Sequence, residues 1–149
     1  MRKLLLFLTL LVVTATACKK AFSVEPANVS VNGVLGTWKL TRYQDLTTKE
    51  EATQPDIKKF GEMTITFRAD GTASGRINCN DRAFDFTIQN SQMTLVKGIT
   101  TKVGCDETWP ENFYKVFENP TNMPHIRVDG TILTLTSADL KRKVTMNKL

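Results

Sequence analysis

The sequence predicts a mainly β protein of the α+β class. We expect an antiparallel meander that forms a small open barrel, with one packed helix near residues 109–118. Three observations lead to this prediction: apolar and polar residues alternate through most of the chain, typical turn residues separate the alternating runs, and one segment alone has helical spacing.

The alternating runs are short and share a period of two residues. The apolar members are Trp38 and Leu40; Met63, Ile65 and Phe67; Phe84, Phe86 and Ile88; Met93 and Leu95; Leu133 and Leu135; Val144 and Met146. A period of two gives a strand one apolar face and one polar face. Asp70-Gly71, Asn90-Ser91 and Asp129-Gly130 lie between runs and favour tight hairpin turns. Such hairpins in series predict a meander that curls into a barrel.

One segment breaks the period of two. Its apolar residues stand at spacings i, i+4, i+7 and i+8, namely Trp109, Phe113, Val116 and Phe117. This spacing predicts a helix with one face on the sheet. Thr108 and Glu111 have the spacing of a capping box, and Asn119-Pro120 ends the segment. Thr47–Glu62 is polar without a firm period, and we expect a long loop with a helical turn near Ile57–Phe60.

The first residues have the parts of an export signal. Arg2 and Lys3 precede an apolar stretch, and small residues follow it directly before Cys18. The apolar stretch is too short to span a bilayer, which requires about 20 residues, so residues 1–17 are predicted to be a signal peptide. "ATAC", ending at Cys18, is similar to the lipobox of bacterial lipoproteins. We therefore expect Cys18 to carry lipid and to become the mature N-terminus; an ordinary cleaved signal is the alternative.

The remainder divides into a tether and one domain. Residues 18–33 are predicted to be the lipid anchor and a flexible tether, and residues 34–149 to be the domain. The protein should thus lie in the bacterial cell envelope, anchored to a membrane through Cys18. No Asp follows Cys18, which favours the outer membrane over the inner one.

Charge argues against nucleic acid as a partner. The chain has 20 Lys and Arg against 15 Asp and Glu. Loss of Arg2 and Lys3 with the signal leaves 18 basic residues, so the mature chain has a net charge of +3. A nucleic-acid surface requires clustered basic residues within a recognisable motif, and the sequence has neither. The charges are interpreted as solvated faces.

Cys79 and Cys105 remain once Cys18 is lipidated. Alternation puts Ile77 and Cys79 on one strand face, and Ile99, Val103 and Cys105 on one face of a later segment. Both thiols are therefore expected to point inward, and an exported chain meets oxidising conditions. We predict a disulfide between them; two free buried thiols are the alternative if the strands are not adjacent. A zinc site would require more ligands than the single histidine, His125, provides.

No catalytic constellation is visible. Asp81 and Asp85 have the parity of a solvated strand face, whereas carboxylate catalysis requires two carboxyl groups across a cleft. The chain has no glycine-rich phosphate loop and no Gly-x-Ser-x-Gly motif. We expect neither an enzyme nor a bound cofactor or metal.

Five stretches together resemble the META/HslJ domain family. They are "LGTWKL" from Leu35, "MTITFRADGTASGRINCN" from Met63, "ITTKVGC" from Ile99, the helix with Glu111 and Phe113, and "VDGTILTLTSADLKRKVTM" from Val128. The chain differs at Asn78, where the family has Gly, and in the long Thr47–Glu62 loop. The resemblance implies a small β-rich open barrel with one helix, no catalytic residues, and a role in envelope stress or drug tolerance.

Two function classes follow. The first is a non-catalytic, lipid-anchored envelope protein that acts by contact with a protein or with the envelope. The alternative is a small-ligand or lipid-binding barrel, because Gly36-Thr37-Trp38 is also the Gly-x-Trp opening of lipocalins. The two function classes differ in whether the barrel interior has room for a ligand. If the bulky residues all point inward, a small barrel has no room for a ligand; these residues are Met63, Phe67, Phe84, Phe86, Met93, Leu135 and Met146.

Overall fold

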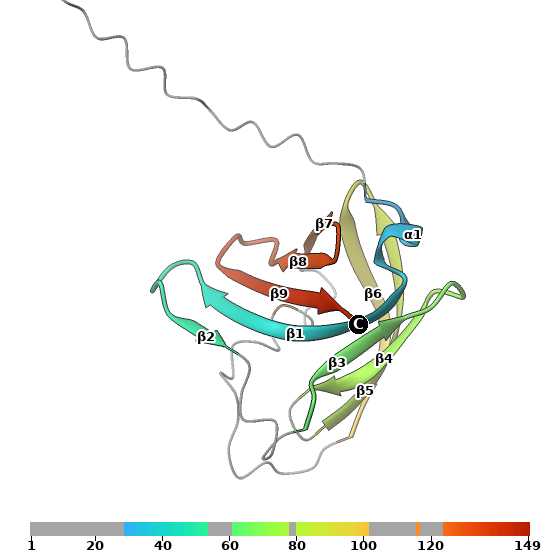
Figure 1. Cartoon of the computed structure of the whole chain (residues 1–149). Helices are drawn as coiled ribbons and strands as arrows, with labels where there is room; N and C mark the ends of the chain where they lie inside the picture. The colour runs from blue at the N-terminus through green and yellow to red at the C-terminus, as the bar shows by residue number, and fades with distance from the viewer. Residues whose placement is uncertain (1–28, 54–60, 78–79, 102–115, 117–123) are drawn as a thin grey trace, which may run out of the picture.

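The computed structural model describes residues 29–53, 61–77, 80–101, 116 and 124–149 (Figure 1). The predicted signal peptide, Cys18, Cys79, Cys105 and the predicted helical turn at Ile57–Phe60 lie outside these residues. So does the predicted helix at 109–118, except for Val116, which is buried.

The described residues form one short helix and nine strands. The helix is α1 (Val31–Val34), and the strands are β1 (Gly36–Asp45), β2 (Glu51–Thr53), β3 (Thr64–Phe67), β4 (Thr72–Ile77), β5 (Asn80–Gln89), β6 (Gln92–Thr100), β7 (His125–Asp129), β8 (Ile132–Thr136) and β9 (Arg142–Lys148). Six of these strands, β1, β3, β5, β6, β8 and β9, coincide with the alternating runs of the sequence, so the mainly β prediction is confirmed.

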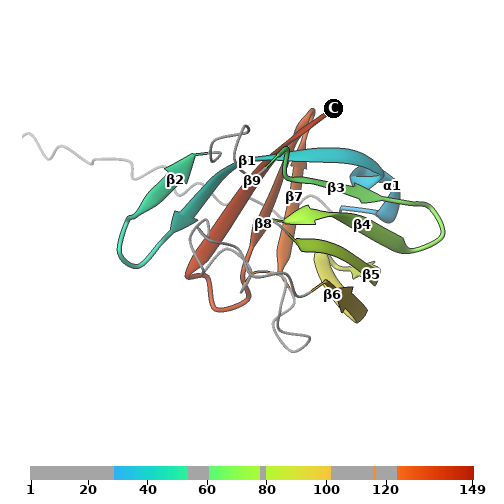
Figure 2. The same cartoon turned by 90° about the horizontal axis from the view of Figure 1, so that it is seen from below.

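Every strand pairs antiparallel with its neighbour, in the order β2-β1-β3-β4-β5-β6-β7-β8-β9. The predicted meander is thus confirmed, and β1 also pairs with β9 along most of its length, which closes the ring (Figures 1 and 2). The barrel therefore consists of β1 and β3–β9, with β2 added outside it on the far half of β1. The weakest described junction joins β6 to β7, where only Gln92 and His125 are in register.

Part of the expected long loop at Thr47–Glu62 is a strand instead. Glu51–Thr53 forms β2 and pairs with Arg42–Gln44 of β1. The turn before it is held by the Asp45 carboxylate, which accepts hydrogen bonds from the amides of Thr47 and Thr48 at 2.8 and 2.9 Å. Within β2 only Ala52, the partner of Tyr43, packs against the core, so this strand of three residues is too short for its period to indicate it.

The inward faces of the strands meet in one core. Its buried apolar side chains are Val34, Trp38, Leu40, Tyr43, Met63, Ile65, Phe67, Ala73, Ile77, Phe84, Phe86, Met93, Val116, Ile126, Leu133, Leu135, Val144 and Met146. The Phe67 ring packs edge-on against Phe86, with centroids 5.1 Å apart, and against Phe84 at 6.3 Å. Edge-to-face contacts of this kind are favourable beyond the area they bury.

Two extra residues bend the ring and change which residues point inward. Thr41 is unmatched between β1 and β9, and Val96 between β5 and β6. Such bulges increase strand bending and twist. After the first bulge Tyr43 rather than Arg42 enters the core. After the second, the alternation of β6 is reversed.

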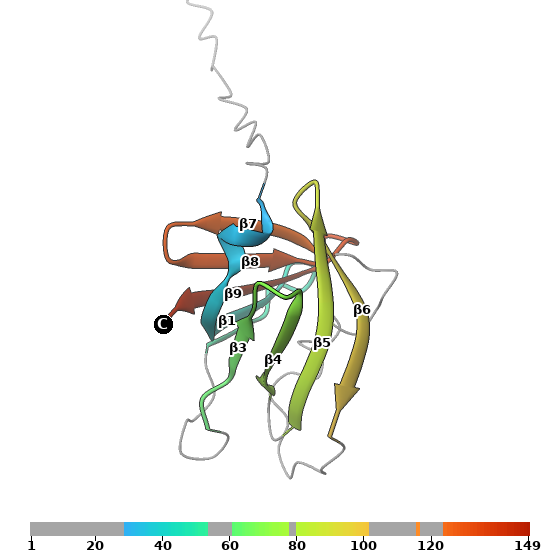
Figure 3. The ribbon, with the colours of Figure 1, turned by 90° about the vertical axis from the view of Figure 1, so that its right-hand side faces the viewer.

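The segment before β1 closes one end of the barrel. The Val29 amide donates to Ser91 Oγ at 2.9 Å, in the β5–β6 hairpin, and Trp38 Nε1 donates to the Val34 carbonyl at 2.6 Å. Figure 3 shows α1 lying across this end beside the hairpin. Residues 29–33, which the sequence analysis assigns to the tether, thus pack on the barrel. We call Val29–Val34 the N-terminal strap.

Candidate functional site

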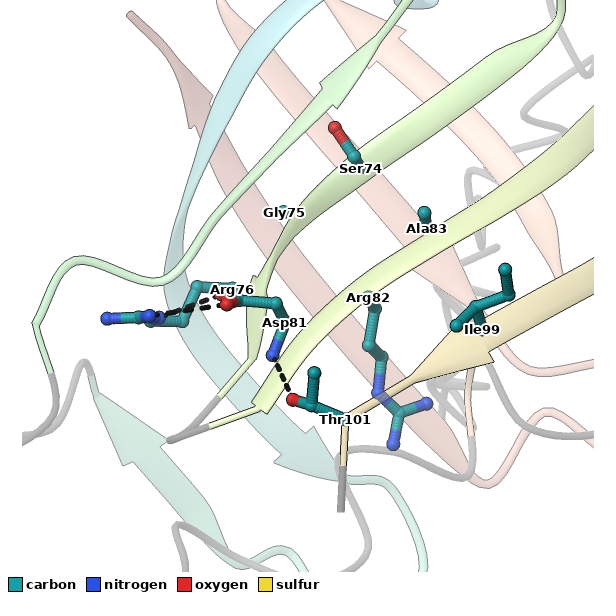
Figure 4. A pocket seen from close by; sticks show the side chains of 8 residues that line it. All are labelled: Ser74, Gly75, Arg76, Asp81, Arg82, Ala83, Ile99 and Thr101. Carbon is teal, nitrogen blue, oxygen red and sulfur yellow. Dashed lines mark hydrogen bonds and ion pairs between the residues drawn. The ribbon is translucent and has the colours of Figure 1, made fainter. Parts of the chain in front are cut away.

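A shallow groove of about 480 Å³ crosses the outer face of the barrel. It lies over β4, β5 and the end of β6, and is lined by Ser74, Gly75, Arg76, Asp81, Arg82, Ala83, Ile99 and Thr101 (Figure 4). We call this surface the outer groove. It is open to solvent and separate from the core.

Strand register explains the two rows of side chains that form the groove. One row consists of Ser74, Ala83 and Ile99, which are directly paired across β4, β5 and β6. The next consists of Arg76 and Asp81, also directly paired. Thr101 lies beyond them and donates its amide to the Asp81 carbonyl at 3.1 Å. The first row is short or apolar and the second is charged or hydroxylated.

The charged row is an exposed ion pair. Arg76 Nε and Nη2 donate to the two carboxylate oxygens of Asp81 at 3.0 and 3.4 Å. This hydrogen bonding lowers the pKa of the Asp81 carboxyl and raises that of the Arg76 guanidinium. Both groups therefore stay charged at neutral pH, and the groove presents a fixed cation beside a fixed anion.

The end of the groove is fixed by a hydroxyl. Thr101 Oγ1 accepts a hydrogen bond from the Asp81 amide at 3.0 Å, as Figure 4 shows. Arg82 belongs to neither row of outward side chains. In Figure 4 its side chain extends away from the face of the sheet that carries Ser74 and Ala83. The backbone of Arg82 lines the groove, while its side chain belongs to the inner side of β5.

The groove has the chemistry of a contact surface. It offers a carboxylate, a guanidinium, two hydroxyls and apolar carbon, all open to solvent. An acid–base pair for catalysis requires a pKa moved toward neutrality by burial, whereas Asp81 is exposed and its pKa is lowered. Within the described ranges, no group of three or more His, Cys, Asp or Glu side chains is arranged to hold a metal ion.

The barrel interior is occupied by large side chains where the structure describes it. All seven residues proposed to fill it, Met63, Phe67, Phe84, Phe86, Met93, Leu135 and Met146, are buried. Trp38 and Leu133 join them with no exposed surface. This is the arrangement expected when a small barrel is filled by its own residues.

The structure tests the predicted cysteine sites only through their neighbours. Cys18, Cys79 and Cys105 lie outside the described residues, so lipidation and the disulfide stay predictions. Ile77, expected to point inward with Cys79, is buried. Ile99, expected to point inward with Cys105, is 78% exposed; that expectation is wrong, because the Val96 bulge reverses the alternation of β6.

Sequence reasoning missed the outer groove. Its central residue, Ala83, is a small residue at an outward position, and its most apolar one, Ile99, was assigned to the core. Only the pair Arg76 and Asp81 left a signal, as opposite charges five residues apart in a segment expected to be strand. In the part of the chain that is described, no helix has the length and apolar character needed to cross a membrane.

The sequence profile of the META domain matches residues 29–148. The chain belongs to the META domain family. The match begins at Val29, the first residue of the N-terminal strap, so the strap is part of the META domain of this chain. Among curated proteins, none matches the chain significantly.

Solved structures show the same fold at low sequence identity. A Burkholderia xenovorans protein solved by NMR is 13% identical, with a TM-score of 0.63 over 80% of this chain and 86% of that one. A DUF4847 family protein from Bacteroides vulgatus is 16% identical, with a TM-score of 0.51 over 76% and 92%. A third protein, also solved by NMR, is 18% identical, with a TM-score of 0.57 over 80% and 95%. The META barrel of this chain is therefore similar to all three in fold.

Proposed function

We propose that this META domain protein is a non-catalytic, lipid-anchored protein of the bacterial envelope that acts by contact through its outer groove. The observation that carries the proposal is the contrast between two surfaces. The inner face is occupied by Trp38, Leu133 and the bulky residues around them, while the outer groove is open and chemically varied. A rigid barrel with an occupied interior must meet other molecules on its outside. Contact of this kind would contribute to envelope stress or drug tolerance.

The proposed location at a membrane depends on lipidation of Cys18. Acyl chains contribute about 0.8 kcal/mol for each buried CH₂, so several chains on one cysteine anchor a protein firmly. Eleven residues after Cys18 the chain is already packed against the barrel through Val29. The domain would thus stay close to one membrane, the outer membrane being favoured. Cys18→Ala should move the protein to the soluble periplasmic fraction; a variant that resists a carbonate wash would contradict the lipid anchor.

A disulfide between the two other cysteines would fit the same compartment. We propose that Cys79 and Cys105 form a structural disulfide, since Ile77, two residues before Cys79, points into the core. Closing a loop of about 25 residues would stabilise the fold by roughly 3–4 kcal/mol on the chain-entropy model. Reduction should lower the melting temperature, and Cys79→Ser with Cys105→Ser should lower it equally. If reduction leaves the melting temperature unchanged, the two thiols are free.

Photo-crosslinking in intact cells tests contact at the groove. A photoreactive residue replaces Ala83 on the groove floor or, as the matched control, Thr134 on the outward face of β8. We expect a discrete crosslinked product from position 83 and none from position 134. Equal labelling from both positions, or no product from position 83, would contradict the proposed function.

A further inference from the structure

The outer groove presents a cation and an anion side by side, so the grooves of two molecules can be complementary to each other. We propose that its partner is a second copy of this chain, joined by a two-fold axis that runs between β4 and β5. The proposal rests on the proposed function of the groove as a contact surface, and it names the partner.

An exposed apolar side chain, Ile99, lies at the rim of the outer groove. Ile99 is 78% exposed, which makes it the most exposed large apolar residue among those described, and Val96 on the same strand is 57% exposed. Ile99 is directly paired with Ala83, whose methyl group is the smallest side chain of that row. One face therefore presents a protruding side chain beside a low floor. Two copies facing each other would remove Ile99 of both copies from solvent, because in a two-fold interface each surface meets itself.

The charged side chains of the groove can also pair between two copies. Arg76 and Asp81 are adjacent and exposed, with an Nε–Oδ1 distance of 3.0 Å. Across a two-fold axis, Arg76 of each copy can meet Asp81 of the other, giving four alternating charges. Asp85 and Lys97 are directly paired on the far side of the Ala83 row and are also exposed. This face thus carries directly paired opposite charges on both sides of the Ala83 row.

A face on which cations and anions stand side by side suits self-association better than capture of a strongly charged polymer. An anionic partner would meet Asp81 and Asp85 together with the cations. A second copy gains attraction at both ion pairs and burial of two Ile99 side chains. Complementary potentials of this kind select a partner and disfavour others.

The test uses the full chain, co-expressed with two different tags after Leu149, an exposed terminal residue. Membranes are solubilised in mild detergent, one tag is captured, and the other is measured. We expect wild-type copies to be recovered together. Arg76→Asp paired with itself places only anions at the contact, and Asp81→Arg paired with itself places only cations. Each should reduce recovery at least tenfold.

The mixed pair decides the question. Arg76→Asp co-expressed with Asp81→Arg restores opposite charges across the axis, so recovery should return to at least half of the wild-type level. Chains that had merely misfolded would not be rescued in this way. Ile99→Asp should reduce recovery as the charge reversals do, and Ile132→Asp, at an exposed apolar position on β8, should not.

Three outcomes would overturn the dimer: wild-type copies that are not recovered together, a mixed pair recovered no better than its single variants, or equal effects of Ile99→Asp and Ile132→Asp. The product crosslinked from position 83 separates this failure from failure of the proposed function. A product of twice the chain mass supports the dimer. A product of another mass overturns the dimer while contact at the groove stands, and no product overturns both.

Discussion

Gly75 shows how one residue sets the shape of the groove. It lies opposite Ile65 in the β3–β4 pair. A Cβ atom at this position would lie 1.9 Å from the Thr64 carbonyl oxygen and 2.8 Å from the Ile65 Cα. Both are backbone atoms, so no side-chain rotation can make room. Glycine in a strand often marks such a close approach of two backbones. Here it allows β4 to lie close against β3 beside the outer groove.

Gly75→Ala should therefore destabilise the fold. Forcing the strands apart costs about 2–3 kcal/mol, as overpacked sites do. Urea unfolding measures the change, with Gly98→Ala as the matched control. A Cβ at Gly98 would meet nothing nearer than 3.9 Å, so that variant should stay within about 0.5 kcal/mol of wild type. Equal midpoints for the two variants would show that the β3–β4 contact is not tight.

Asp45 shows how a single carboxylate organises the β1–β2 hairpin. Amide hydrogen bonds, first from Thr48 and then from Thr47, hold the pKa of Asp45 below its ordinary value. A carboxyl group whose pKa is lower in the folded chain stabilises the fold above its unfolded pKa of about 3.9. That contribution is lost as the pH falls through the lower, folded pKa.

The hairpin should therefore weaken in acid. NMR titration of Asp45 should give a midpoint below about 3.9. The urea midpoint of the wild type should fall between pH 5 and pH 2 by more than that of Asp45→Asn. The amide of Asn still accepts hydrogen bonds but does not titrate. A midpoint at or above the ordinary value would contradict the hydrogen bonding described here.

At the scale of elements, the strands could be predicted and the bulges could not. A period of two at Met63, Ile65 and Phe67 reflects a simple physical requirement, one buried face, and the structure buries all three. A bulge adds one residue without changing composition. Thr41 and Val96 carry no turn signal, and yet each reverses the faces of everything after it on its strand. Ile99 was misassigned for this reason, and the groove was missed with it.

The N-terminal strap was also beyond prediction from period. Its buried member, Val34, is followed at once by a strand, and α1 has only four residues. Its attachment depends on contacts distant in sequence, such as the Val29 amide on Ser91 Oγ. Ser91 lies in a tight turn in which both Asn90 and Ser91 have positive φ. This turn positions the Ser91 hydroxyl to accept the hydrogen bond from the Val29 amide.

Ser91→Gly should loosen the strap while leaving the barrel intact. Glycine adopts positive φ freely, so the turn remains and the hydroxyl acceptor is lost. One hydrogen bond contributes about 1 kcal/mol, so the Val29 amide should exchange with solvent roughly fivefold faster. The amide of Leu135 in the core of β8 serves as the reference and should be unchanged. If both amides accelerate together, the strap and the barrel open as one unit.

At the scale of the whole molecule, ring closure is the main result that the sequence left open. The sequence predicts an open barrel, whereas in the structure the first and last long strands pair from Trp38–Lys148 to Asp45–Arg142 and close it. This pairing joins residues about as far apart as the domain allows, so no local pattern reports it. Closure pairs β1 with β9, which would otherwise leave open edges, and surrounds a core filled by large side chains. On the proposed function, other molecules meet the outer face.

The central claim is that this protein works from its outer surface and admits no ligand inside. Trp38 belongs to the core and has no exposed surface, and in a Trp109→Phe variant it is the sole tryptophan. Its fluorescence should stay unchanged when brominated fatty acids, which quench tryptophan on contact, are added in excess. Saturable quenching of Trp38, reversed by the unbrominated fatty acid, would show a ligand inside the barrel and contradict the account.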